Sequence, residues 1–149
     1  MLVLFVLDEQ HYALCLPAVE RVVRAVEITP LPKAPEIVLG IINARGRVIP
    51  VIDVRRRFHL PTRAIKPDDR FIIASTSRRL VVLVVDSVAG VRELTDRQMV
   101  SVEQSLPFAE YLTGVAKLED DLALIYDLDR FLSLDEETVL DSALAGGHA

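Results

Sequence analysis

The sequence predicts a mainly β fold of two small β-barrel lobes, with a helix near the C-terminus. Val, Ile and Thr supply 36 of the 149 residues, and their branched side chains suit pleated strands. Apolar residues occur in short runs separated by turn-forming residues, which is the pattern of successive strands. The second half of the chain also repeats part of the first, which favours two similar units. This length favours one domain, residues 1–149.

The first strands are predicted within residues 2–28. Residues 2–7 and 12–16 are apolar runs joined by four polar residues, as in a β-hairpin. We expect a turn or short helical passage over residues 17–22 and a strand over residues 22–28. The segment Thr29-Pro-Leu-Pro32 ends that strand, because proline lacks the N–H group that a strand ladder needs.

The remaining elements follow from turn and helix signals. Residues 35–39 begin with proline and predict one helical turn, and residues 41–53 predict two strands around a turn at Gly46. Acidic residues 135–137 suit the N-terminus of a helix over residues 134–144. Four other apolar runs predict strands over residues 71–74, 80–85, 88–94 and 122–126.

The internal repeat has an offset of 74 residues. In that register residues 40–53 match residues 114–127, and each block starts with glycine and ends with aspartate. A weaker match between residues 19–22 and 88–91 extends it upstream at an offset of 69. Two barrel lobes sharing one chain explain the repeat, because closing a barrel leaves few exposed sheet edges.

Charge is unevenly distributed. The net charge is −5, but residues 43–79 carry +7 and residues 103–149 carry −9. A basic stretch raises nucleic acid as a partner, yet only Phe58 and Phe71 could stack on bases there. Arginine outnumbers lysine 14 to 3, and arginine suits fixed pairs between proteins. We therefore interpret the stretch as a protein interface and expect no nucleic acid.

The sequence contains no motif of a catalytic or cofactor site. It lacks a phosphate-binding loop, a nucleophile elbow and a dinucleotide fingerprint, and its three histidines are not at metal-ligand spacing. We expect no enzyme, no metal and no cofactor. The single cysteine, Cys15, is expected to be a small buried side chain. The apolar runs are too short to span a bilayer, and the N-terminal residues do not resemble a signal peptide. We therefore expect a cytoplasmic protein without direct membrane insertion.

One stretch resembles a known family. Pro35-x-x-Val38-x-Gly40-Ile-Ile-Asn-Ala-Arg-Gly46-x-Val-Ile-Pro-Val-Ile-Asp53-Val-Arg55-x-x-Phe58 is similar to the CheW-like family, and the similarity runs from about residue 2 to about residue 143. The resemblance implies two intertwined, SH3-like, five-stranded β-barrels. It also implies a non-enzymatic adaptor that couples chemoreceptors (methyl-accepting chemotaxis proteins) to the regulatory domain of a CheA-type histidine kinase, recruited to membrane-associated receptor arrays.

The resemblance also implies two sets of contact residues. The expected receptor-binding groove contains Val19, Arg21, Val22, Arg45 and Val88. The expected kinase-binding face contains Gly46, Val48, Val51, Arg56 and Arg57. Core packing is the alternative role for the groove valines, and a solvated helix start is the alternative for Arg55–Arg57.

Two departures from the family pattern affect the groove. The usual Asn-Leu-Arg-Gly is Asn43-Ala-Arg-Gly46 here, and the usual Val-x-Glu-Val is Val19-Glu-Arg-Val22. Arg21 and Arg45 should then repel each other, unless Glu20 swings in or a partner supplies the anion. A different class of function, a β-barrel module that binds a small molecule or nucleic acid, stays open because such barrels have many functions.

Overall fold

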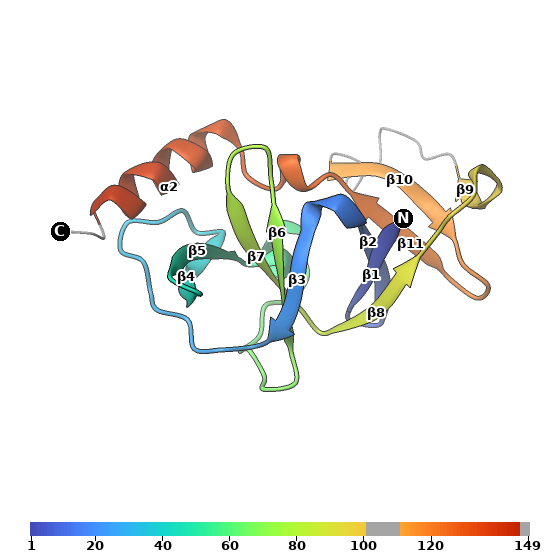
Figure 1. The fold of residues 1–149 in the computed structure, drawn as a ribbon, viewed down its shortest axis with the longest axis horizontal. Helices are drawn as coiled ribbons and strands as arrows, with labels where there is room; N and C mark the ends of the chain where they lie inside the picture. The colour runs from blue at the N-terminus through green and yellow to red at the C-terminus, as the bar shows by residue number, and fades with distance from the viewer. Residues whose placement is uncertain (101–110, 147–149) are drawn as a thin grey trace.

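The strands of the computed structural model form two mostly antiparallel sheets. The structure describes residues 1–100 and 111–146. Sheet A has the order β8-β1-β2-β11-β10-β9, and sheet B has the order β3-β6-β7-β5-β4 (Figure 1). The strands of sheet A are β1 (Leu2–Leu7), β2 (Gln10–Cys15), β8 (Ser87–Arg92), β9 (Met99–Val100), β10 (Leu112–Lys117) and β11 (Leu122–Tyr126). Those of sheet B are β3 (Val19–Arg24), β4 (Val38–Ala44), β5 (Arg47–Ile52), β6 (Arg70–Ser75) and β7 (Leu80–Val85).

Helices are few among the described residues. These contain the α-helices α1 (Val54–Arg57) and α2 (Leu134–Gly146) and the 3-10 turns η1 (Leu16–Ala18), η2 (Asp96–Gln98) and η4 (Leu128–Arg130). Helix α2 lies beside sheet B, at the end of the molecule away from sheet A (Figure 1). In the described ranges, no helix combines the length and the apolar character needed to cross a membrane.

The structure confirms the internal repeat and shows how the lobes share the chain. Hairpin β4–β5 is equivalent to hairpin β10–β11, and each contributes one strand to a parallel pair, β5 with β7 and β11 with β2. The chain leaves hairpin β1–β2 of sheet A to form edge strand β3 of sheet B. It leaves hairpin β6–β7 of sheet B to form edge strand β8 of sheet A. Each sheet therefore has an edge strand that follows directly, along the chain, on a hairpin of the other sheet.

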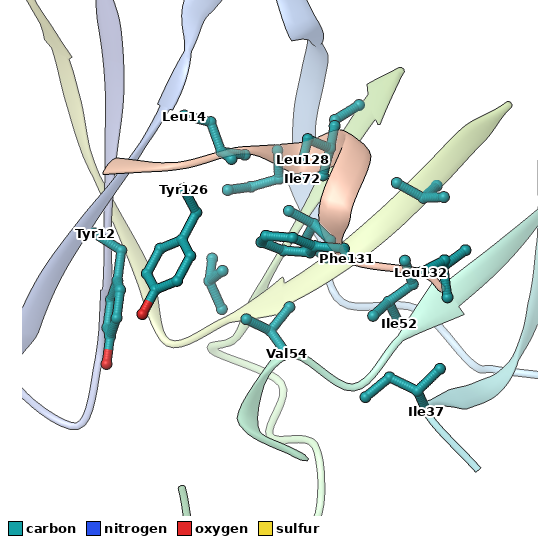
Figure 2. Packing of buried hydrophobic residues seen from close by; sticks show 14 of the residues in the cluster. Tyr12, Leu14, Ile37, Ile52, Val54, Ile72, Tyr126, Leu128, Phe131 and Leu132 are labelled. Carbon is teal, nitrogen blue, oxygen red and sulfur yellow. The ribbon is translucent and has the colours of Figure 1, made fainter. Parts of the chain in front are cut away.

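A shared core joins the two sheets. Alternate residues of the central strands enter different cores: Ile72 and Leu83 pack in the core between the sheets, whereas Phe71 and Val82 pack inside sheet B. This burial of both faces explains why the strands appear in the sequence as unbroken apolar runs. Figure 2 shows Phe131 in the middle of the shared core, between Tyr126 and Ile52. The lobes therefore form one packed unit.

Several sequence predictions need correction at their boundaries. Strand β3 starts at Val19 instead of residue 22, because η1 completes the turn by Ala18. The helical turn predicted over residues 35–39 is instead a single hydrogen-bonded turn: the amide of Val38 donates to the carbonyl of Pro35 at 2.9 Å, and β4 begins at Val38. Strands β9 and β10 were not predicted. Cys15 is exposed, since it ends β2 with its side chain away from the core.

Candidate interaction surfaces

Four charged residues meet where β3 approaches the β4–β5 turn. We call Glu20, Arg21, Arg45 and Arg47 the arginine cluster. Arg47 donates to both carboxylate oxygens of Glu20, at 3.1 and 2.7 Å. This hydrogen bonding lowers the pKa of Glu20, and the charges of Arg47, Arg21 and Arg45 lower it further. Glu20 has therefore turned toward Arg47, which leaves Arg21 and Arg45 without a bonded carboxylate among the described residues.

The three valines of the predicted receptor groove differ in exposure. Val19 and Val88 are partly buried and pack against the shared core, so core packing accounts for part of each side chain. Val22 is 38% exposed on edge strand β3. Arg45 lies in the tight turn between β4 and β5, with a positive φ of 53°. The groove itself stays a prediction.

The predicted kinase-binding face is only partly at the surface. Gly46 occupies the turn with φ +79°, as its position in the sequence predicted, and Val48 is 43% exposed on β5. Val51 is fully buried among the residues inside sheet B, so its side chain cannot contact a partner directly. Arg56 is exposed and pairs with Glu36 at 3.1 Å.

Arg57 also faces the interior of the fold and anchors α2. Its guanidinium donates to both oxygens of Glu136 at 2.7 Å and to the hydroxyl of Tyr111 at 3.3 Å. Arg79 makes a second anchor, to the buried Glu137 at 2.8 Å and to Asp141. The acidic start of α2 therefore carries specific ion pairs in addition to its favourable position in the helix dipole. Sign reversal at Arg57 would disturb folding instead of testing a docking surface.

A charged network that the sequence pattern did not reveal joins the lobes. Arg55 is 8% exposed and donates to Asp86 at 2.7 and 2.9 Å, while it pairs with Asp8 at 2.8 Å. Arg63 bonds Asp69 at 2.8 Å and Asp86 at 2.6 Å. Asp8 belongs to the β1–β2 turn, and Asp86 links β7 to β8. The network therefore ties the crossover between sheets to α1.

The sequence suggested that the basic stretch, residues 43–79, is a protein interface. In the structure it is mainly not one. Six of its nine arginines form ion pairs within the chain: Arg47, Arg55, Arg56, Arg57, Arg63 and Arg79. Arg70 donates to the backbone carbonyls of Asp68 and Asp69. The preference for arginine over lysine thus reflects fork-shaped bonding inside the fold.

The network predicts acid sensitivity. The hydrogen bond from Arg63 holds the pKa of the buried Asp69 below its usual value of 3.8. Ionised Asp69 therefore stabilises the fold above about pH 4, and this contribution is lost as the pH falls through the lower folded-state pKa. We expect Asp69→Asn to lower the melting temperature at pH 7 and to flatten its decline below pH 4, as measured by circular dichroism. Asp68→Asn, at an exposed neighbour, is the control; parallel curves for wild type and Asp69→Asn would contradict this role.

Comparison with known proteins identifies the family. Among the described residues, no group of three His, Cys, Asp or Glu side chains is placed to hold a metal ion. The family model described as the CheW-like domain matches residues 1–136. The chain belongs to the CheW-like family. Its fold class is confirmed: mainly β, two sheets, short helices and a C-terminal helix, with a two-residue sixth strand in sheet A.

Relatives within the CheW-like family match over most of their length. The Chemotaxis protein CheW of Thermotoga maritima is 32% identical over 128 residues, which is 86% of this chain and 84% of that protein. The Chemotaxis protein CheW of Treponema pallidum is 28% identical over 141 residues, or 91% of this chain and 83% of that protein. The crystal structure of scaffolding protein TtCheW from Thermoanaerobacter tengcongensis superposes with a TM-score of 0.82 at 32% identity, covering 91% of this chain and 93% of that one. The chain is thus a chemotaxis adaptor, and the comparisons do not support the alternative of a small-molecule or nucleic-acid module.

Proposed function

We propose that this chain is a non-enzymatic scaffold that couples chemoreceptors to a CheA-type histidine kinase. The observation that carries the proposal is the match over nearly the whole length to a scaffolding protein of the same two-sheet fold. A scaffold must hold two contact surfaces at a constant separation. The shared core and the Arg55–Asp86 network supply that rigidity here, because packed interiors transmit position without deforming.

The two contact surfaces lie mainly on sheet B. The receptor would bind along edge strand β3 and the β4–β5 turn, where Val22 and Arg45 are exposed. The kinase regulatory domain would bind around Gly46, Val48 and Arg56, while Val51 supports this face from beneath. In the cell the protein would be cytoplasmic and recruited to receptor arrays through these contacts. It would neither hydrolyse ATP nor accept a phosphoryl group from the kinase.

Substitution at Val48 tests this arrangement. Val48→Glu replaces the exposed apolar side chain of β5 with a charge and should weaken binding to the kinase regulatory domain about tenfold, since a charge buried in an interface is costly. Leu122→Glu is the matched control, because Leu122 occupies the repeat-equivalent position in sheet A and is 44% exposed, close to the 43% of Val48. Binding is measured by surface plasmon resonance, and the melting temperature of each variant is checked first. Equal loss of binding in both variants would show that the kinase-binding face is placed wrongly.

A further inference from the structure

A cavity of about 310 Å³ opens beside the core of sheet B. Its apolar wall is formed by Leu39 of β4, Val84 of β7 and the half-buried Ile28 and Ile65. Ile28, Ile65 and Val84 also pack against the core inside sheet B, so this wall is anchored in the fold. The volume is at the lower end of the range for pockets that hold small organic molecules, and such pockets often occur at the mouths of β-barrels. The cavity therefore has the size and the apolar surface of a small ligand site.

The remaining lining of the cavity is mainly charged. Arg55 and Arg63 supply two positive charges, and Asp53 and Asp86 supply two negative ones. Both guanidinium groups are already neutralised, since each pairs with Asp86 and with one further aspartate. The oxygens of Asp86 are used as well, because they accept from both arginines and from a backbone amide of the β1–β2 turn. An added anion would therefore meet no unpaired guanidinium among the described residues of the lining.

Asp53 is the carboxylate of this lining that has no ion pair with a described residue. Its Oδ1 accepts from the amide of Arg56 at 3.2 Å and caps α1, whereas its Oδ2 has no hydrogen-bond donor in the described ranges. In sheet A the equivalent Asp127 pairs with Arg130 at 3.5 Å. In sheet B the equivalent arginine, Arg56, instead pairs with Glu36 at 3.1 Å. Sheet B therefore lacks the ion pair that sheet A makes, and a negative charge remains at the cavity.

We propose that this cavity binds a small organic ammonium ion with an apolar chain. The ammonium group donates to Oδ2 of Asp53, and the chain lies against Leu39, Ile65 and Val84. A neutral head group would leave the carboxylate without a counter-charge, and an anionic one would add a second negative charge. The unpaired carboxylate therefore selects the head group, and the apolar wall selects the chain. The site is additional to the scaffold function, and either can fail without the other.

Titration of the ¹⁵N-labelled full chain with n-hexylamine tests the proposal by NMR at pH 7, where the amine is protonated as a lysine side chain is. We expect saturable shifts of the amide resonances of Asp53, Val84 and Asp86, with a Kd of about 1 mM for a ligand of so few atoms. n-Hexanol and n-hexanoate have the same chain with a neutral and a negative head group, and they should bind about tenfold more weakly. Equal affinity for the amine and the alcohol would overturn the proposal. So would shifts confined to residues outside the cavity, or the absence of saturable shifts up to about 10 mM amine.

Asp53→Asn and Asp127→Asn are a matched pair of variants, because asparagine can retain the helical cap that each aspartate provides. Asp53→Asn should weaken binding of n-hexylamine about tenfold and leave that of n-hexanol unchanged. Asp127→Asn, in the other lobe, should change neither. Wild-type affinity of Asp53→Asn for the amine, or an equal loss in both variants, would contradict the assignment to this cavity. The comparison of head groups uses the wild-type chain, so it decides the result if Asp53→Asn lowers the melting temperature.

Discussion

Gly40→Ala is expected to lower the free energy of unfolding by about 3 kcal/mol, the upper part of the range for overpacked interiors. A Cβ at this position would lie 2.3 Å from the carbonyl oxygen of Thr29 and 2.6 Å from Cγ2 of Ile28. Thr29 cannot move away easily, because its backbone exchanges two hydrogen bonds with Ile41, at 2.9 and 2.8 Å. Thr29 and Ile41 form an isolated antiparallel bridge, which holds the two segments this close.

Gly46→Ala is the control for this substitution. Gly46 also has a positive φ, +79°, but nothing lies within 4 Å of the position of its Cβ, so only backbone strain of about 1 kcal/mol is expected. For a protein of this size, the melting temperature should fall by about 6–12 °C for Gly40→Ala and by about 2–4 °C for Gly46→Ala. Equal falls in a thermal melt would show that the contact with Thr29 can relax.

Arg55→Met is expected to destabilise the fold by about 3 kcal/mol, the lower end of the cost of breaking a buried ion pair. The substitution keeps the apolar stem of the side chain. Among the described residues, it leaves Asp8 without an ion-pair partner and Asp86 with Arg63 as its remaining ion-pair partner. The lower end applies because Asp8 and Asp86 retain contact with solvent. Since these residues join the β1–β2 turn to the β7–β8 link, the loss should loosen the junction between the sheets.

Arg56→Met provides the matched control at the next residue. The guanidinium of Arg56 pairs with the exposed Glu36 and with no other described side chain, so its loss should change the stability by less than about 0.5 kcal/mol. Urea denaturation followed by circular dichroism gives both values. If the two variants unfold at the same urea concentration, the network contributes nothing beyond ordinary surface pairing.

The fold was predictable because the sequence patterns that indicate strands, turns and the repeat are local or periodic. Apolar runs gave the bounds of β1, β7 and β11 as the structure has them. The repeated aspartates, Asp53 and Asp127, proved to have the same role: each caps the helical turn that follows its strand, by accepting from a backbone amide two or three residues on. A repeat with equal spacing therefore predicted two lobes of equivalent topology.

The interaction surfaces were harder to predict, because charge in sequence does not reveal pairing in space. The acidic partners of Arg55, Arg57 and Arg79 lie 31 to 79 residues away along the chain. Nothing local distinguishes these arginines from the exposed Arg56. The burial of Val51 was not predictable for a related reason: a strand buried on both faces lacks the alternation that would separate an inward from an outward valine.

Assembly of the three components tests the central claim, that this chain couples receptors to the kinase. Receptor cytoplasmic fragments are assembled on vesicles, mixed with the histidine kinase, and sedimented with and without this chain. We expect the kinase to sediment with the receptor only when the chain is present, in an amount that follows the amount of chain bound. Equal sedimentation of the kinase without the chain, or exclusion of the kinase from the receptor by bound chain, would contradict the coupling role.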